Sequence, residues 1–144
     1  KRTGQTFPQA GAARTEANRA AAAAALAAGI RCATDVTGFG LLGHLHKLAR
    51  ASGLTARLTA SAVPYLDGAR AALADGFVSG GTRRNLAWVR PHLAATGVTE
   101  DELLLLADAQ TSGGLLVAGE LPGHPVIGEL LPARPDGVTV VVTG

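Results

Sequence analysis

The chain has 144 residues and a formal net charge of +2, from 13 Lys and Arg against 11 Asp and Glu. These basic residues are dispersed, whereas nucleic-acid-binding domains gather theirs on one face or stripe, so we expect no nucleic-acid partner. No apolar run approaches the roughly 18 residues of a membrane span, and we expect no membrane segment. The one cysteine, Cys32, excludes an internal disulfide and suits a reducing, cytoplasmic location.

The composition also predicts the character of the core. The hydrophobic fraction is 47% but only 3% of the residues are aromatic, so the core should consist of Ala, Leu and Val. Cys32 lies in the apolar segment of residues 30–33, where burial as a small hydrophobic residue is favoured over a reactive thiol. The expected large anchors of the core are Trp88, Tyr65, Phe7, Phe39 and Phe77.

The first third of the chain predicts a tail, a helix, a strand and a second helix. Residues 1–14 contain Gly and Pro without hydrophobic periodicity, which is typical of a tail or linker, so the domain should occupy residues 15–144. Thr15 is suited to cap a helix that Gly29 would end. A strand is expected over residues 31–36 and a helix over residues 39–52, with Gly53 at its end.

The remainder of the chain alternates short strands with helices. A strand is expected over residues 55–60, a helix over 66–74, and a helix capped by Thr99 through Leu106. Gly80 and Gly81 favour a loop over residues 77–85, and residues 85–93 fit either a strand or a helix. Strands at residues 115–118, 126–130 and 138–142 complete an α+β fold, with a mixed or mainly antiparallel sheet and helices packed on one face.

Residues 33–44 read A-T-D-V-T-G-F-G-L-L-G-H. This run places Asp35 before a glycine turn and an apolar helix, where its carboxylate could face a metal or phosphate, or cap the helix. The run also contains G-x-G-x-x-G, but the next strand ends in Ala60 and Ser61 without the acid that holds a ribose, which disfavours dinucleotide binding. His44 is expected on the helix surface or at an interface rather than as a metal ligand, because no other His, Cys or acidic residue stands four positions further on.

A second run, D-A-Q-T-S-G-G-L-L, covers residues 108–116. The hydroxyls of Thr111 and Ser112 and the successive N–H groups of Gly113 and Gly114 could form an anion-binding nest. The same residues could equally make a turn that leads into the strand beginning at Leu115.

Together, in this order, the two runs resemble the carboxy-terminal domain of selenophosphate synthetases (selenide, water dikinases), whose pattern is close to A-T-D-V-T-G-F-G-L-L-G-H and, later, D-P-Q-T-S-G-G-L-L. The resemblance covers residues 15–142 and implies the α+β domain that aminoimidazole ribonucleotide synthetases share. It implies that Asp35 binds Mg²⁺ and that ATP is the substrate, split with selenide and water into selenophosphate, AMP and phosphate. The residues implied to face phosphate or the cleft are Thr34, Thr37, Gly38, Gly40, Gln110, Thr111, Ser112, Gly113 and Gly114.

In that family the nucleophilic Cys or selenocysteine, its partner Lys and the glycine-rich ATP segment belong to an amino-terminal domain. None of these motifs is present here, so we expect no catalytic residue in this domain alone. The expected partner is the N-terminal ATP-binding domain of the same protein, in a homodimer when full length, whether this chain is a fragment or a separately encoded half. A non-catalytic docking module, or a domain of a related ATP-using enzyme, is the alternative.

Three further segments compare with the family pattern. Residues 80–85 resemble its G-G-T-x-R-N, where Arg84 would either face phosphate or belong to a solvated loop. Ala109 replaces the usual Pro. Only residues 119–125 stand where the family usually places a helix, so the strands on either side should be joined by a tight antiparallel connection with residues 121–123 exposed, or the sheet should be rearranged.

Overall fold

Helix α2 (Gly40–Ser52) packs against one face of a four-stranded sheet and organises the structure. Its buried residues recur at helical spacing, and it ends at Gly53, whose φ of 64° lets its N–H donate to the carbonyl oxygens of Ala49 and Arg50. The helix begins after Phe39 without a side-chain cap, so the interpretation of Asp35 as its cap is wrong. The computed structural model describes residues 18–110 and 113–144, which leaves Thr15 and the tail of residues 1–14 outside the described part.

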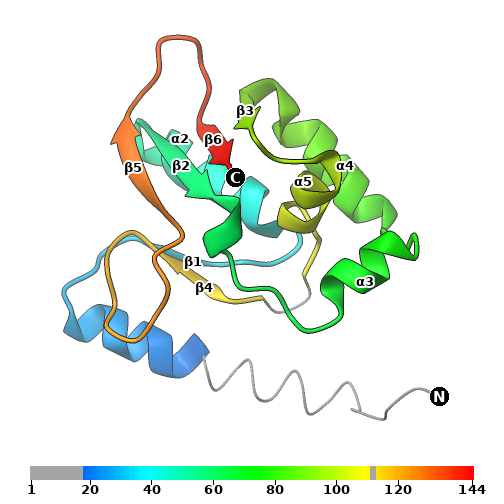
Figure 1. Ribbon diagram of the computed structural model, residues 1–144. Helices are drawn as coiled ribbons and strands as arrows, with labels where there is room; N and C mark the ends of the chain where they lie inside the picture. Colours follow the sequence, from blue (N-terminus) through cyan, green and yellow to red (C-terminus); the bar gives the residue numbers. More distant parts are fainter. Residues whose placement is uncertain (1–17, 111–112) are drawn as a thin grey trace.

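The strands form two separate sheets (Figure 1). The larger has the order β3 (Leu93–Thr96), β6 (Val140–Thr143), β2 (Leu54–Thr59) and β5 (Gly128–Pro132), with β6 parallel to β3 and β2, and β5 antiparallel to β2. The smaller pairs β1 (Ala33–Asp35) antiparallel with β4 (Leu115–Val117). The α+β class with a mixed sheet is confirmed.

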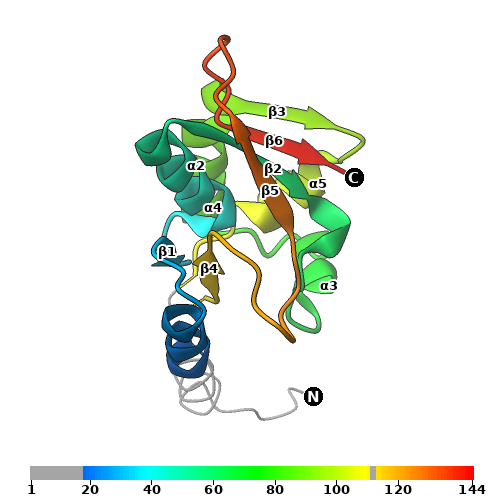
Figure 2. The same ribbon diagram turned by 90° about the vertical axis from the view of Figure 1, so that its left-hand side faces the viewer.

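The remaining helices are α3 (Ala69–Ala74), α4 (Gly80–Val89) and α5 (Glu100–Leu106), with 3₁₀ turns η1 (Ala60–Ala62) and η2 (Arg90–His92). Helices α2, α4 and α5 lie together beside the large sheet. Helical residues 18–27 lie beyond β1 and β4, at the end of the molecule away from that sheet (Figure 2). Among these described helices, none has the length and apolarity needed to cross a membrane.

The strands on either side of α2 belong to different sheets, β1 to the small one and β2 to the large one. A dinucleotide-binding unit requires both strands to be parallel in one sheet with the helix as their crossover. The G-x-G-x-x-G match in residues 38–43 therefore has no dinucleotide-binding context.

The core is aliphatic, as the composition predicts, but its expected aromatic anchors are mostly at the surface. The buried cluster consists of Leu, Val and Ala side chains, among them Leu42, Leu58 and Leu106. Tyr65 is partly buried against this cluster, Phe7 lies outside the described residues, and the exposed aromatic residues are Phe39, Phe77 and Trp88. The prediction was wrong for these three because small aliphatic side chains already fill the space between α2 and the sheet.

His46 is the buried titratable residue of α2. Its Nδ1 lies 2.6 Å from Thr139 Oγ1, and its ring stacks on His92 with 4.6 Å between centroids. Burial lowers the pKa of His46, with smaller contributions from His92 and Arg50. The neutral imidazole thus joins α2 to the segments before β3 and β6.

Helix α4 occupies most of the segment expected to be a loop. Ser79 caps it, since its Oγ accepts a hydrogen bond of 3.1 Å from the N–H of Thr82. This cap offsets the low helix propensity of Gly80 and Gly81, which is why a loop prediction from the glycines was wrong. Helix α5 begins as predicted, with Thr99 Oγ1 accepting from the N–H of Glu102 at 3.2 Å.

Residues 119–125 connect the two sheets instead of joining neighbouring strands. Strand β4 pairs with β1 and β5 pairs with β2, so β4 and β5 are not neighbours and, of the two alternatives, the tight antiparallel connection is not formed. Leu121 is buried, so the expected exposed turn is limited to Pro122 and Gly123. A short connection without a helix is possible here because it leads from the small sheet to the large sheet and does not have to cross over one sheet.

Inserting three Gly or Ser residues after Pro122 should lower the free energy of unfolding by less than about 1 kcal/mol, because loop-closure entropy grows slowly with length. Leu121→Ala should cost about 2 kcal/mol or more, because it removes buried apolar contacts. Urea denaturation measures both. An insertion as damaging as Leu121→Ala would show that the Pro122 turn is itself packed into the structure.

Candidate functional site

The two motif runs lie side by side. Val36 donates its N–H to the carbonyl oxygen of Gly114 at 2.9 Å, and Gly113 donates its N–H back to Val36 at 2.9 Å. The N–H of Gln110 donates to the carbonyl oxygen of Thr37 at 3.1 Å. Backbone pairing thus joins Val36 and Thr37 to the second run. The candidate site consists of residues 34–40 together with residues 107–110 and 113–114.

Two glycines allow this approach. A Cβ on Gly40 would lie 2.5 Å from the backbone carbon and oxygen of Ala107, and Gly40 has a φ of +68°. A Cβ on Gly113 would lie 2.3 Å from the carbonyl oxygen of Val36. Gly38 and Gly114 have open space in the direction of a Cβ, so close approach does not account for them.

Asp35 ends strand β1, opposite Leu115. Its neighbour Val36 is buried and Asp35 is exposed, in keeping with the alternation of side chains along an extended strand. Within residues 18–110 and 113–144, the Asp35 carboxylate makes no hydrogen bond or ion pair. It is therefore available to a ligand from outside the described part of the domain.

The donor set fits a single position on a magnesium ion. Mg²⁺ commonly takes one or two protein carboxylates and fills its other positions with water and substrate phosphates. In the described ranges, no group of three or more His, Cys, Asp or Glu side chains could hold a metal by itself. Asp35 fits as one ligand of an ion that takes its other ligands from elsewhere.

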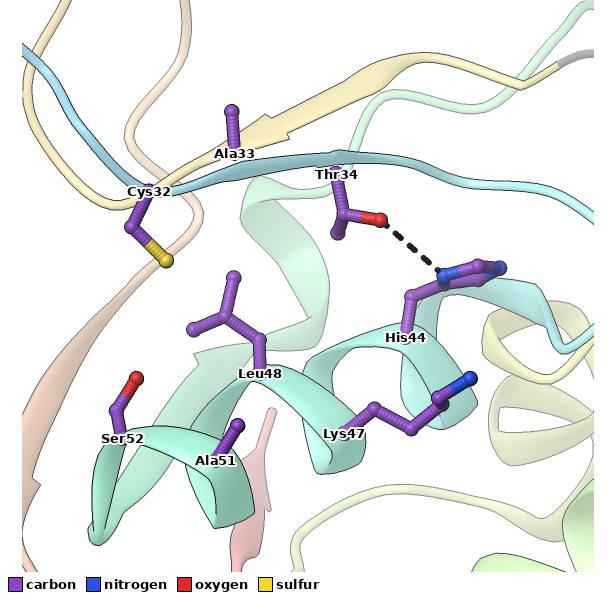
Figure 3. Close-up of a pocket in the computed structure, with 8 residues that line it drawn as sticks. All are labelled: Cys32, Ala33, Thr34, His44, Lys47, Leu48, Ala51 and Ser52. Atoms are coloured by element: carbon purple, nitrogen blue, oxygen red, sulfur yellow. Dashed lines mark hydrogen bonds between the residues drawn. The ribbon is translucent and has the colours of Figure 1, made fainter.

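His44 contacts both threonines that flank Asp35 and Val36. Its Nε2 accepts a 3.0 Å hydrogen bond from the N–H of Thr37 and lies 3.1 Å from Thr37 Oγ1. Its Nδ1 lies 3.5 Å from Thr34 Oγ1 (Figure 3). The hydroxyls of Thr34 and Thr37 therefore face His44.

The surroundings of His44 favour its neutral form. Burial lowers its pKa, Lys47 lowers it further, and Asp35 raises it by a smaller amount. A neutral imidazole keeps a lone pair on one ring nitrogen, which the N–H of Thr37 requires of Nε2.

Helix α4 holds both runs from the other side. Asn85 Nδ2 donates to the carbonyl oxygen of Gly38 at 2.8 Å and to that of Ala107 at 3.1 Å. The buried Thr82 donates from Oγ1 to Asp108 Oδ1 at 2.6 Å. One helix face thus fixes the turn after Asp35 and the start of the second run.

Residues 2–118 match the family described as AIR synthase related protein, C-terminal domain. The chain belongs to this family. It is 44% identical over 128 residues to a selenide, water dikinase of Bordetella bronchiseptica, covering 79% of this chain and 37% of that protein. It is 46% identical over 115 residues to the selenide, water dikinase of Burkholderia pseudomallei (79% and 32%), and 52% identical over 90 residues to that of Pseudomonas putida (62% and 26%).

The chain thus spans between about a quarter and somewhat over a third of the length of these relatives. The resemblance seen in the two motif runs is confirmed. The family match ends at residue 118, immediately before the short connection of residues 119–125 where the sequence departs from the pattern.

Within this AIR synthase related domain, the structure brings together most of the predicted site residues but not all of them. Thr34, Asp35, Thr37, Gly38, Gly40, Gln110, Gly113 and Gly114 are brought together, and Thr111 and Ser112 lie outside the described residues. The N–H of Gly113 is bonded to Val36, so it is not free for the anion-binding nest considered from the sequence. Arg84 is exposed on α4 and not in a loop.

Sequence reasoning missed Thr82 and Asn85, and it placed His44 on the helix surface without assigning its contacts. The signal for the first two was the G-G-T-R-R-N run, which contains Thr82 and Asn85 on either side of Arg83 and Arg84. Thr82 and Asn85 bond to groups 26 and 22 residues further along the chain, and His44 bonds back to Thr37, seven residues before it. Spacing alone does not show these contacts.

A pocket of about 310 Å³ lies beside the site, between β1 and α2. Figure 3 shows Cys32 and Ser52 at one end of it and His44 and Lys47 at the other. Cys32 is only half-buried and lines this pocket, so its prediction as a core residue was wrong.

Proposed function

We propose that this chain is the carboxy-terminal domain of an ATP-dependent selenide, water dikinase, which converts selenide, ATP and water into selenophosphate, AMP and phosphate. The observation that carries the proposal is the joining of the two motif runs around the exposed carboxylate of Asp35. Identities of 44%, 46% and 52% to proteins of that name support it.

In this proposal Asp35 supplies one ligand to Mg²⁺. When bound, the ion neutralises charge on the phosphates of ATP, which together with positioning accounts for most of the catalysis of phosphoryl transfer. Thr34, Thr37, Gly38 and Gly40 form one wall of the cleft. Its other wall is the second motif run, of which Gln110, Gly113 and Gly114 are paired with the backbone of the first run.

The domain acts with the rest of the full-length protein. The matched part covers only 37% and 32% of the two relatives, and the partner we propose is an N-terminal ATP-binding domain of the same protein. We further propose a cytoplasmic homodimer. The chain holds one cysteine, Cys32, which faces the pocket between β1 and α2, and the nucleophile of the reaction is assigned to the N-terminal domain.

The proposal is tested by measuring AMP formation from ATP with selenide and Mg²⁺. Three proteins are compared: the full-length protein, the 144-residue chain, and the full-length protein without these 144 residues. Only the first should form AMP, because the metal ligands and the nucleophile are divided between the two parts. Robust activity of the isolated chain, or a full-length protein that is inactive with selenide, would contradict the proposal and favour a docking module or a related ATP-using enzyme.

A further inference from the structure

His44 is the side chain that fixes the backbone on both sides of Asp35. It lies near the beginning of α2, and its ring reaches Thr37 through two contacts of 3.0 and 3.1 Å to Nε2. On the other side of Asp35, Thr34 Oγ1 lies 3.5 Å from Nδ1 and also donates to the carbonyl oxygen of Asp35 at 3.2 Å. One imidazole thus contacts both ends of the segment from Thr34 to Thr37.

The segment from Thr34 to Thr37 is also held at Val36, which lies between the two threonines that contact His44. Val36 is buried, and both its N–H and its carbonyl oxygen are paired with the second motif run. The carbonyl oxygen of Thr37 accepts from the N–H groups of Gln110 and Gly40, but within the described residues the N–H of Thr37 has no backbone acceptor. The bond from the Thr37 N–H to His44 supplies the missing contact on the side of α2.

The orientation of the ring excludes a direct role as a metal ligand in this conformation. Nε2 faces the Thr37 N–H and Nδ1 faces the Thr34 hydroxyl, so neither nitrogen points to a ligand outside the domain. The edge-to-face contact with Phe39, 5.7 Å between centroids, holds the ring in this orientation.

We propose that His44 is a positioning residue, which ties the Thr34–Thr37 loop to α2 and thereby holds the Asp35 carboxylate in one place for a divalent cation. This inference rests on the proposed function, because that function gives Asp35 its cation. Outer groups that orient metal ligands typically contribute roughly 10- to 100-fold to metal affinity. His44 acts through the loop and not on the carboxylate itself, which places it at the lower end of that range.

The test compares His44→Leu, His44→Gln and the control His124→Leu in the full-length protein. Two quantities are measured without turnover: the affinity for Mn²⁺ as a spectroscopic probe, and the hydrogen-exchange rate of the Thr37 amide. His44→Leu should weaken Mn²⁺ binding about tenfold and speed exchange of the Thr37 amide. His44→Gln should restore both, because its side-chain oxygen can replace Nε2 as acceptor. The exposed His124 lies in the connection between the sheets, and its variant should match wild type.

The proposal is overturned if His44→Leu leaves Mn²⁺ affinity and Thr37 exchange unchanged, or if His44→Gln binds Mn²⁺ as weakly as His44→Leu. Should the Leu variant not fold, Thr37→Val serves instead: it removes the hydroxyl contact and should weaken Mn²⁺ binding, and unchanged affinity would overturn the proposal. Failure of the proposed function has a different result. A wild-type protein that binds Mn²⁺ through Asp35 but forms no AMP with selenide would reject the reaction while leaving the role of His44 in place.

Discussion

Changing Asp35 to Asn in the full-length protein should lower selenide-dependent AMP formation by roughly 100-fold or more, a typical loss when one preorganised electrostatic contact to a transition state is removed. The amide keeps the size of the side chain but lacks the charge that binds Mg²⁺. Thermal stability should hardly change, because Asp35 is exposed and its carboxylate makes no bond within the described ranges 18–110 and 113–144. Steady-state AMP formation and thermal unfolding of the same preparation measure the two effects.

Asp67→Asn is the matched control for this variant. Asp67 is also exposed, but it precedes α3 and belongs to neither motif run, so its replacement should leave turnover unchanged. Normal turnover of the Asp35 variant would remove the residue from the proposed metal site. A loss of activity accompanied by an equal loss of folded protein would give Asp35 a structural role instead.

The elements that the sequence predicts best are those whose signals are local. Helix α2 ends at Gly53 as predicted, because a glycine is suited to the left-handed residue after a helix. Helix α5 starts after Thr99 because a hydroxyl followed by three acidic residues satisfies the first turn. Neither feature depends on a distant partner.

The errors arose where a distant contact or a compensating residue decides the structure. Two glycines disfavour a helix at the start of α4, yet the Ser79 cap and the bonds of Thr82 and Asn85 to the motif runs hold it there. Strand spacing treated β4 and β5 as candidates for one sheet, whereas each pairs with an earlier strand. The buried position of Leu121 follows from that crossing between sheets.

In the candidate site, too, some residues could be recognised from the sequence and others could not. The motif runs and Asp35 could be recognised from residue types and order, and their joining is the structural counterpart of the family resemblance. The partners of His44 could not be recognised. The sequence shows a histidine beside the apolar face of a helix, but it does not show which backbone N–H donates to that histidine. Such partners become visible only when the loop and the helix are placed together.

The largest effect on stability should come from Gly40→Ala. The new Cβ would lie 2.5 Å from the backbone of Ala107, and the φ of +68° disfavours any residue with a Cβ. Strain and overpacking together should lower the free energy of unfolding by about 2–5 kcal/mol. Because the displaced backbone belongs to the second motif run, activity of the full-length protein should fall as well.

Gly53→Ala, at the other end of the same helix, separates the two causes. Its φ of +64° is nearly the same, but a Cβ there meets no atom within 4 Å, so only the conformational strain of about 1–2 kcal/mol applies. Urea denaturation of both variants gives the difference, which measures the steric closeness of α2 to residues 107–108. Equal losses in the two variants would show that this closeness contributes nothing, and that the runs are joined by hydrogen bonds alone. A larger loss for Gly40→Ala, with activity reduced in the Gly40 variant and kept in the Gly53 variant, would support the close contact as the feature that sets the distance between the two motif runs.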